Sequence, residues 1–194
     1  MSEAVATLMT LDQFWDWQGR QAIRYELVDG VPWATASAHQ RHDVTVANEL
    51  IEVGSQLRDS SYRVFTADQT VVTRAANGRR LDLELDCGLI EGLSMKATSP
   101  KVVTGVLSRS TRTLDQVGKL DGYTEVESIE QVVLADPDQP FVILRSRSPG
   151  RRWTTTPAGV DTMTAFLHQA GRRKHKPRSW HDLYTPAVHA LAGS

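Results

Sequence analysis

The segment 81–86 alternates leucine with an acid, giving Asp82, Glu84 and Asp86 at every second position. Because successive side chains of a strand point to opposite faces, this period predicts three leucines on one face and three carboxylates on the other. Carboxylates two residues apart on a strand stand about 7 Å apart. They could hold a divalent cation or orient a water molecule beside one. A strand face turned to solvent, paired with the arginines before it, would produce the same pattern.

Three other side chains could take part in such chemistry. Glu26 precedes an Asp-Gly pair, either as an ordinary exposed strand residue or as a functional acid. His39 and His42 are three residues apart near an expected helix start. They could share a metal or contact a phosphate, or they could be exposed or capping histidines.

Ser108 and Lys119 belong to a strand end and to the helix that follows it. Ser108 could help to cap that helix, or it could bind phosphate where the free N–H groups of the helix point outward. Lys119 could be a surface charge or could point toward the carboxylates. Cys87, the single cysteine, excludes an intramolecular disulfide and a cysteine-rich zinc site.

These residues need a scaffold, and the hydrophobic pattern predicts one. Thr10 and Gln13 have capping-box spacing at the start of a first helix, and Asp29-Gly30 marks a hairpin turn within 24–36. Helices are further expected over 39–58, 111–126 and 160–170, strands over 62–66, 70–74, 80–86, 101–108, 129–135 and 141–145, and a turn at Asn77-Gly78.

This order predicts an α/β or α+β fold, with a mixed sheet core flanked by two principal helices and preceded by a helix and hairpin. The strand–helix–strand unit over 101–135 predicts at least one parallel strand pair. In the helix over 39–58, the inward residues are expected to be Val44, Ala47, Leu50, Ile51 and Leu57.

Length and composition indicate one domain and a tail. The chain has 194 residues, 40% of them hydrophobic, and no apolar segment of about 18 residues that would predict a membrane helix. Without a basic, apolar leader, a cytoplasmic location is expected. Lys and Arg number 22 against 23 acids, yet 172–178 contains five Lys or Arg and no acid. We therefore expect an acidic domain over 1–170 and a basic tail over 171–194, which is either a solvated terminus or a source of phosphate affinity.

Seven segments, in this order, have a family likeness. They are 9–14, 24–30 with the letters RYELVDG, His42, 62–65, 80–82, 106–111 with the letters VLSRST, and 118–123. Together they resemble the Uma-two family of putative restriction endonucleases, a branch of the PD-(D/E)xK nuclease superfamily. The likeness covers about residues 9–170.

The resemblance implies a restriction-endonuclease-like fold and a metal-dependent endonuclease that acts on DNA with Mg²⁺ or Mn²⁺. It implies that Asp82 binds the metal, Glu26 is a helper acid on the first strand, and Lys119 polarises the scissile phosphate or the attacking water. We expect His42, Ser108 and the tail residues Arg172, Arg173 and Lys174 to contact nucleic acid. A homodimer would place two sites to cut both strands.

One departure from the family bears directly on the site. The family has Glu immediately before Val-Leu-Ser, where this chain has Gly105. The prolines expected at the positions of Leu81 and Arg109 are also absent. Glu84 or Asp86 could replace the missing ligand, and Glu84 is expected to share the strand face of Asp82. Alternatively, the chain is an inactive nucleic-acid-binding or regulatory protein on the same fold. The sequence leaves both interpretations open.

Overall fold

The computed structural model describes residues 8–35, 39–58, 60–74, 76–107, 115–138, 141–148 and 150–158. Its elements in chain order are α1 (Leu11–Gln18), β1 (Tyr25–Val28), β2 (Val31–Ala34), α2 (Gln40–Leu57), β3 (Arg63–Thr66), β4 (Thr70–Arg74), β5 (Asn77–Arg80), β6 (Leu83–Asp86), β7 (Pro100–Val106), α3 (Asp115–Glu125), β8 (Gln131–Asp136), β9 (Phe141–Arg147) and β10 (Trp153–Ala158). The helix expected over 160–170 and the basic tail lie outside the described residues.

The strands form two sheets. A six-stranded sheet has the order β10-β9-β8-β7-β6-β3, and a four-stranded sheet has the order β2-β1-β5-β4. In the larger sheet β7 and β8 are parallel and the other neighbours are antiparallel, which confirms the expected mixed sheet and parallel pair. The four-stranded sheet and strand β10 were not expected from the sequence.

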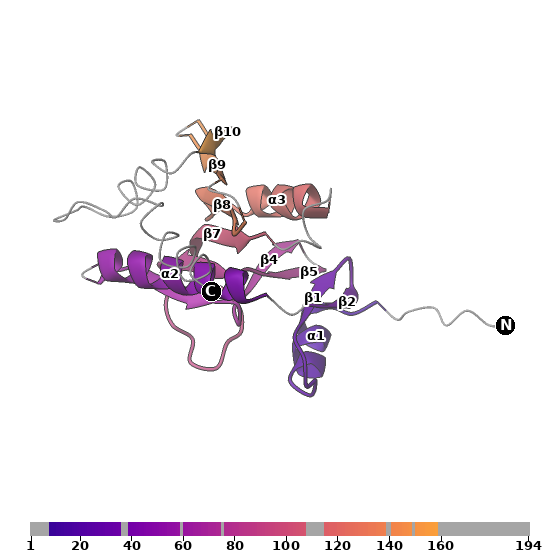
Figure 1. The fold of residues 1–194 in the computed structure, drawn as a ribbon. Helices are drawn as coiled ribbons and strands as arrows, with labels where there is room; N and C mark the ends of the chain where they lie inside the picture. Colours follow the sequence, from indigo (N-terminus) through magenta and orange to yellow (C-terminus); the bar gives the residue numbers. More distant parts are fainter. Residues whose placement is uncertain are drawn as a thin grey trace.

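Helices α2 and α3 cover opposite faces of the six-stranded sheet (Figure 1). The α2 side holds one core cluster, formed by Val53, Leu57, Leu83, Leu85, Val102, Val106, Val133, Ala135 and Val142. The α3 side holds a second, formed by Val71, Leu81, Ala97, Val103, Leu120, Tyr123, Ile129 and Val132. Leu120 and Tyr123 of α3 therefore face the sheet.

The hairpin and first helix form as the sequence indicates. Thr10 and Gln13 make both hydrogen bonds of a capping box. Asp29 and Gly30 have φ angles of 47° and 79°, which suit a two-residue hairpin turn with positive φ at both positions. β2 lies at the edge of its sheet, where the missing N–H of Pro32 is tolerated.

Helix α2 has the expected length but turns a different face inward. Val44 is 41% exposed and Ile51 is 69% exposed, whereas Thr45, Glu49 and Val53 are buried. At 3.6 residues per turn, Val44 and Leu57 lie about 140° apart around the helix, so one face cannot bury both. Burial of Val53 and Leu57 against the sheet fixes the rotation, and the expected stripe is wrong apart from Leu57 and the half-buried Leu50.

The expected strand over 80–86 is two strands in two different sheets. β5 ends at Arg80 and β6 begins at Leu83, and Asn77-Gly78 lies inside β5 rather than in a turn. Leu81 packs on the α3 side, whereas Leu83 packs on the α2 side. The alternation of faces thus breaks at Asp82, which the regular spacing of leucine and acid does not reveal.

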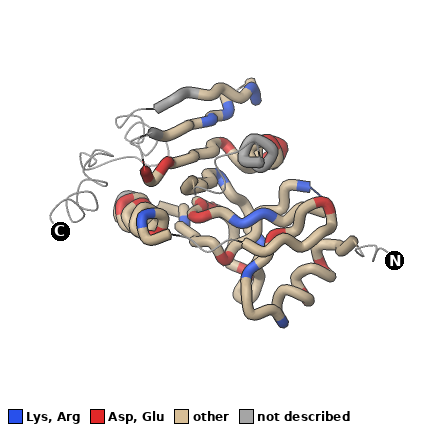
Figure 2. Tube along the Cα trace, turned by 45° about the vertical axis from the view of Figure 1, so that its right-hand side comes forward, with Lys and Arg blue, Asp and Glu red and all other residues tan. Residues whose placement is uncertain are grey.

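The described residues show no large segregation of charge along the backbone (Figure 2). Acidic and basic positions are both spread over the described body (Figure 2). Among the described residues, no helix has the length and apolar character needed to cross a bilayer.

Candidate functional site

Asp82 lies in the bend between β5 and β6, and two contacts hold its carboxylate. Oδ1 is 3.1 Å from Nε2 of His42, and Oδ2 accepts a 2.7 Å hydrogen bond from the backbone N–H of Val106. The backbone N–H of Asp82 donates in turn to the carbonyl oxygen of Thr104 at 3.1 Å. Asp82 is thereby tied to the end of β7, and its side chain keeps 24% exposure.

His42 connects this carboxylate to the start of helix α2. Its hydrogen bond to Asp82 raises the pKa of His42, burial opposes this, and the charges of Asp82 and Asp43 add to the rise. The imidazole is therefore more readily protonated than a free histidine. As an imidazolium it donates from Nε2 to Asp82 and neutralises part of the local negative charge.

A pocket of about 430 Å³ adjoins His42. Its lining comprises His39, Gln40, Arg41, His42, Leu107, Pro137 and Asp138. The pocket thus lies where the parallel strands β7 and β8 end and where α2 begins, a common position for ligands of open α/β sheets. The side chain of His39 makes no capping hydrogen bond, and Arg41 pairs with Asp138 at 3.1 Å. First-turn N–H groups of a helix attract anions such as phosphate.

Glu49 is a buried acid that the sequence analysis missed. It is 1% exposed, and neither carboxylate oxygen has a hydrogen-bond partner among the described residues. Burial, and then the charge of Asp82, raise the pKa of Glu49 to about 8. The sequence could have indicated that Glu49 faces the same way as His42, because positions 42 and 49 are seven residues apart and therefore lie on one face of a helix.

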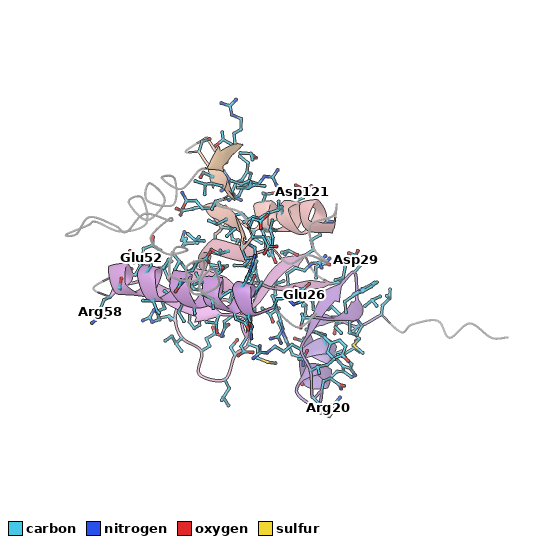
Figure 3. The ribbon with its side chains drawn as sticks, viewed as in Figure 1. Arg20, Glu26, Asp29, Glu52, Arg58 and Asp121 are labelled. Carbon is cyan, nitrogen blue, oxygen red and sulfur yellow. The ribbon has the colours of Figure 1, made fainter. Side chains whose placement is uncertain are left out.

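Glu26 is held within the four-stranded sheet rather than exposed. It is 6% exposed, its Oε1 accepts a 3.1 Å hydrogen bond from the backbone N–H of Arg80, and its Oε2 is 3.5 Å from Nη1 of Arg79. Figure 3 shows it in the interior, between the N-terminal hairpin and the rest of the described chain. Since Arg80 comes two residues before Asp82, Glu26 fixes the end of β5 that leads into the site.

Glu84 and Asp86 are buried, each at 2% exposure, so the acidic face of the segment is not turned to solvent. Glu84 lies opposite Val103, on the α3 side of the sheet, whereas Asp82 turns toward His42 on α2. The expectation that Asp82 and Glu84 share one face is therefore wrong. Burial, and then the charge of Asp86, raise the pKa of Glu84 to about 8.

Asp86 has a structural task that occupies both of its oxygens. It accepts hydrogen bonds from the backbone N–H groups of Gly88, Thr98 and Ser99, and from the hydroxyl of Thr98. These contacts close the loop between β6 and β7. They leave Asp86 poorly suited to replace a metal ligand at Asp82.

Gly105 lies on β7 between Thr104 and Val106, the two residues whose backbone contacts Asp82. Gly105 lies opposite Leu134, which packs on the α3 side, so a side chain at this position would point to that face of the sheet. A Cβ there would lie 3.2 Å from Cδ2 of Leu134, the tip of a flexible side chain. The position can accept a larger residue if Leu134 shifts slightly.

Several expected site residues fall outside what the structure describes. Lys119 belongs to α3, but its side chain is not described. Ser108 and the tail residues Arg172, Arg173 and Lys174 also lie outside the described residues. Their roles remain predictions.

The described acids could supply only a few protein ligands to a metal ion. Within the described part of the chain, no three His, Cys, Asp or Glu side chains are grouped closely enough to hold a metal ion. Mg²⁺, however, is often bound by one or two carboxylates, with waters and substrate phosphate completing the octahedron. Among the described residues, the partly exposed carboxylate of Asp82 supplies one donor of this kind.

A family comparison covers the whole of this site except the basic tail. The model of the Uma-two family (Uma2), described as "Putative restriction endonuclease", matches residues 11–170. The chain belongs to this family. Uma-two membership confirms the likeness seen in the sequence, and the matched range contains Glu26, His42, Glu49, Asp82 and Gly105.

A solved structure supports the fold. A putative nuclease belonging to DUF820 from Anabaena variabilis superposes with a TM-score of 0.67 at 15% sequence identity. The match covers 91% of this chain and 98% of that one. The Uma-two chain therefore has the restriction-endonuclease-like fold that was expected. A comparison with curated proteins gives no match.

Proposed function

We propose that this Uma-two protein is a metal-dependent DNA endonuclease whose reaction centre is Asp82. The observation that carries the proposal is the placement of this carboxylate. Its two oxygens are oriented by His42 and by the backbone of Val106, beside a pocket at the ends of two parallel strands. A carboxylate held in this way is preorganised for a cation and a phosphate.

Each residue of the proposed site would have a different role in the reaction. A bound Mg²⁺ or Mn²⁺ would polarise the scissile phosphate and lower the pKa of a water molecule. Asp82 would hold that cation, and His42 would keep the carboxylate in place. The first turn of α2 would attract a phosphate of the DNA backbone. Glu26 would position β5, and Lys119 is proposed to stabilise charge on the phosphate.

DNA is proposed as the substrate because the family is described as a restriction endonuclease and because the pocket combines His39, Arg41 and a helix N-terminus. The tail, with Arg172, Arg173 and Lys174, would add phosphate contacts that weaken with salt. A homodimer is proposed for cutting both strands, since two sites related by a two-fold axis would each face one strand.

A second candidate function is DNA binding without cleavage. The observation that favours it is Gly105, which places hydrogen where the family has a metal-binding Glu. A cation held by fewer carboxylates binds weakly and is poorly positioned. The protein would then bind nucleic acid or regulate a partner on the same fold.

A cleavage assay distinguishes the two functions. Supercoiled, linear and single-stranded DNA are incubated with the protein in Mg²⁺, in Mn²⁺ and in a chelator. The endonuclease proposal expects nicked or linear products that need the metal and disappear in D82A. Products that persist unchanged in D82A would exclude this site.

A G105E variant completes the assay, because position 105 can accept a side chain if Leu134 moves slightly. If the natural protein does not cut and G105E does, the natural protein is a DNA-binding member on a nuclease fold. If neither cuts but both bind DNA, the endonuclease proposal fails for the substrates used and the binding function is retained.

A further inference from the structure

Helix α2 carries an apolar stripe on the side that faces away from the sheet. The stripe consists of Val44, Ala47 and Ile51, which are all exposed, Ile51 at 69%. At 100° per residue the three positions fall within about 60° of one another, and Ile51 lies about 160° around the helix from Val53. Val53 is buried against the sheet. Single exposed apolar residues are ordinary, but a stripe along one helix face is typical of a packed helix.

The described part of the chain leaves this outer stripe accessible. Among the described elements, α2 packs mainly on β3, β6 and β7, which all belong to the sheet beneath it. Gly54 lies beside the stripe, three residues after Ile51, and a Cβ at this position would have no heavy atom within 4 Å. The small residues Ala47 and Gly54 therefore allow the backbone of another helix to approach α2 closely.

The charges at the two ends of α2 favour a second copy of this helix as the partner. Asp43, whose side chain is 70% exposed and 3.7 Å from Nδ1 of His42, lies eight residues before Ile51. Arg58, which is exposed at the end of α2, lies seven residues after Ile51. Asp43 and Arg58 are thus about 12 and 10 Å from Ile51 along the axis, and both lie on the same side of the stripe.

This spacing selects an antiparallel pair of helices. With a two-fold axis at Ile51, Asp43 of one protomer meets Arg58 of the partner subunit at both ends of the contact. Val44 then packs against the aliphatic part of that same Arg58. A parallel pair would instead place Asp43 against Asp43 and Arg58 against Arg58, and like charges across an interface are unfavourable.

We propose that the outer stripe of α2 is the two-fold interface of a homodimer, in which two copies of α2 pack antiparallel with Ile51 at the axis. The inference deepens the homodimer of the proposed function and rests on it. Both protomers use the same surface, as a two-fold interface requires. The partner helix ends at the level of Thr45, so the first turn of α2, which lines the pocket beside His42, stays open to a ligand.

Oxidative cross-linking of the full-length protein tests the geometry. The variants carry C87S, because Cys87 is the natural free cysteine. I51C places two thiols at the axis and should form a disulfide-linked dimer under mild oxidation. V44C is the matched control, since its two copies are about 21 Å apart along the axis of an antiparallel pair, whereas a disulfide needs Cα atoms within about 7 Å. V44C should therefore stay uncross-linked, although a parallel pair would cross-link it.

Analytical ultracentrifugation without DNA or metal measures the dissociation constant of the dimer. One helix pair is a small interface, so the protein is studied over about 1–200 µM, where weak dimers dissociate. I51E brings two carboxylates together at the axis and should raise the dissociation constant more than about tenfold. L93E is the control, because Leu93 is an equally exposed apolar residue on the loop between β6 and β7, and it should stay within about twofold of the natural protein.

A charge exchange tests the contact at the ends of the helices. R58E faces Asp43 of the partner subunit with a second acid and should raise the dissociation constant about threefold, since exposed ion pairs contribute little. D43R/R58E restores opposite charges and should return the constant to that of the natural protein. Thermal unfolding shows whether each variant is folded, which is expected because the altered side chains are exposed.

Three results would overturn the inference: a natural protein that is monomeric at every concentration, a folded I51E that dimerises unchanged, and a V44C that cross-links as readily as I51C. A dimer that L93E disrupts and I51E does not would assign the interface to the loop between β6 and β7. The DNA assay separates this inference from the proposed reaction. A dimer through α2 that does not cut DNA removes the endonuclease alone, and metal-dependent cleavage by a monomer removes the interface alone.

Discussion

At the scale of single residues, the unusual feature is the burial of three acids that the sequence pattern would leave at the surface. Glu49, Glu84 and Asp86 are each 2% exposed or less. Asp86 is compensated by backbone N–H groups, whereas Glu49 and Glu84 keep unpartnered oxygens among the described residues. The last two are therefore compensated by a proton near neutral pH, which their raised pKa values express.

These two acids should make stability depend on pH. Burial raises the pKa of Glu49 and of Glu84 to about 8 from 4.5, so the folded state holds protons that the unfolded state has lost. Stability from these groups is thus greatest below about pH 4.5 and falls as pH rises toward 8, by at most about 1.4 kcal/mol per pH unit and group. Denaturant unfolding between pH 5 and pH 8, in a chelator, measures this slope.

Glutamine variants provide the comparison. E49Q and E84Q should each flatten the decline, so that their stability relative to the natural protein improves as pH rises. Parallel curves for all three proteins would show that neither acid is protonated in the folded state.

The contact between His42 and Asp82 should be visible in the titration of the histidine. Because the hydrogen bond to Asp82 raises the pKa of His42, that pKa should lie above about 6.5 and should fall in D82N. An NMR pH titration of the imidazole measures both values. E84Q is the control, since Glu84 lies on the other side of the sheet, and the same pKa in D82N and the natural protein would contradict this contact.

At the scale of elements, the position of Asp82 depends on where strands β5 and β6 end and begin. Asp82 stands where β5 leaves the four-stranded sheet and β6 enters the six-stranded one. Glu26 holds the last residues of β5, and Asp86 holds the loop that joins β6 to β7. These two acids therefore fix the chain on both sides of Asp82.

D86A should test the loop closure. The variant loses several hydrogen bonds to a buried carboxylate and leaves their N–H groups without partners, so it should lower the free energy of unfolding by about 3 kcal/mol. Denaturant unfolding measures the loss. D121A is the control, because the side chain of Asp121 on α3 (labelled in Figure 3) is 60% exposed and pairs with Arg145 at 3.1 Å. An equal, small effect of both variants would show that Asp86 does not hold the loop.

At the scale of the whole molecule, charge is divided between an acidic body and a basic tail. The segment 172–178 contains five Lys or Arg, although the full chain has a net charge of −1. The described body shows both signs spread over it (Figure 2). Sequence-independent attraction to DNA is therefore expected to come in large part from the tail.

The triple variant R172Q/R173Q/K174Q should measure this contribution. If all three residues contact phosphates, the slope of log K against log salt concentration should become shallower by up to about 2.7, at about 0.9 per contact. Fluorescence anisotropy with labelled duplex DNA at several salt concentrations gives the slope. An unchanged slope would assign the DNA contacts to the folded domain.

The sequence by itself determined the features that depend on local physics. The capping box at Thr10, the hairpin turn at Asp29-Gly30 and the parallel pair around α3 follow from residue type and spacing, because each involves neighbours along the chain or a short crossover. It also determined the family likeness that the comparison over 11–170 confirmed, and the absence of an acid at Gly105.

Only the tertiary structure decided on which face of the sheet or helix each acid lies. The spacing of leucine and acid placed Asp82 with Glu84, but the chain changes sheet at Asp82 and separates their faces. The hydrophobic stripe of α2 likewise pointed away from Glu49, whose burial comes from the packing of Val53 and Leu57 on the sheet. Both outcomes depend on contacts between segments distant in sequence, and a periodic pattern within one segment carries no information about them.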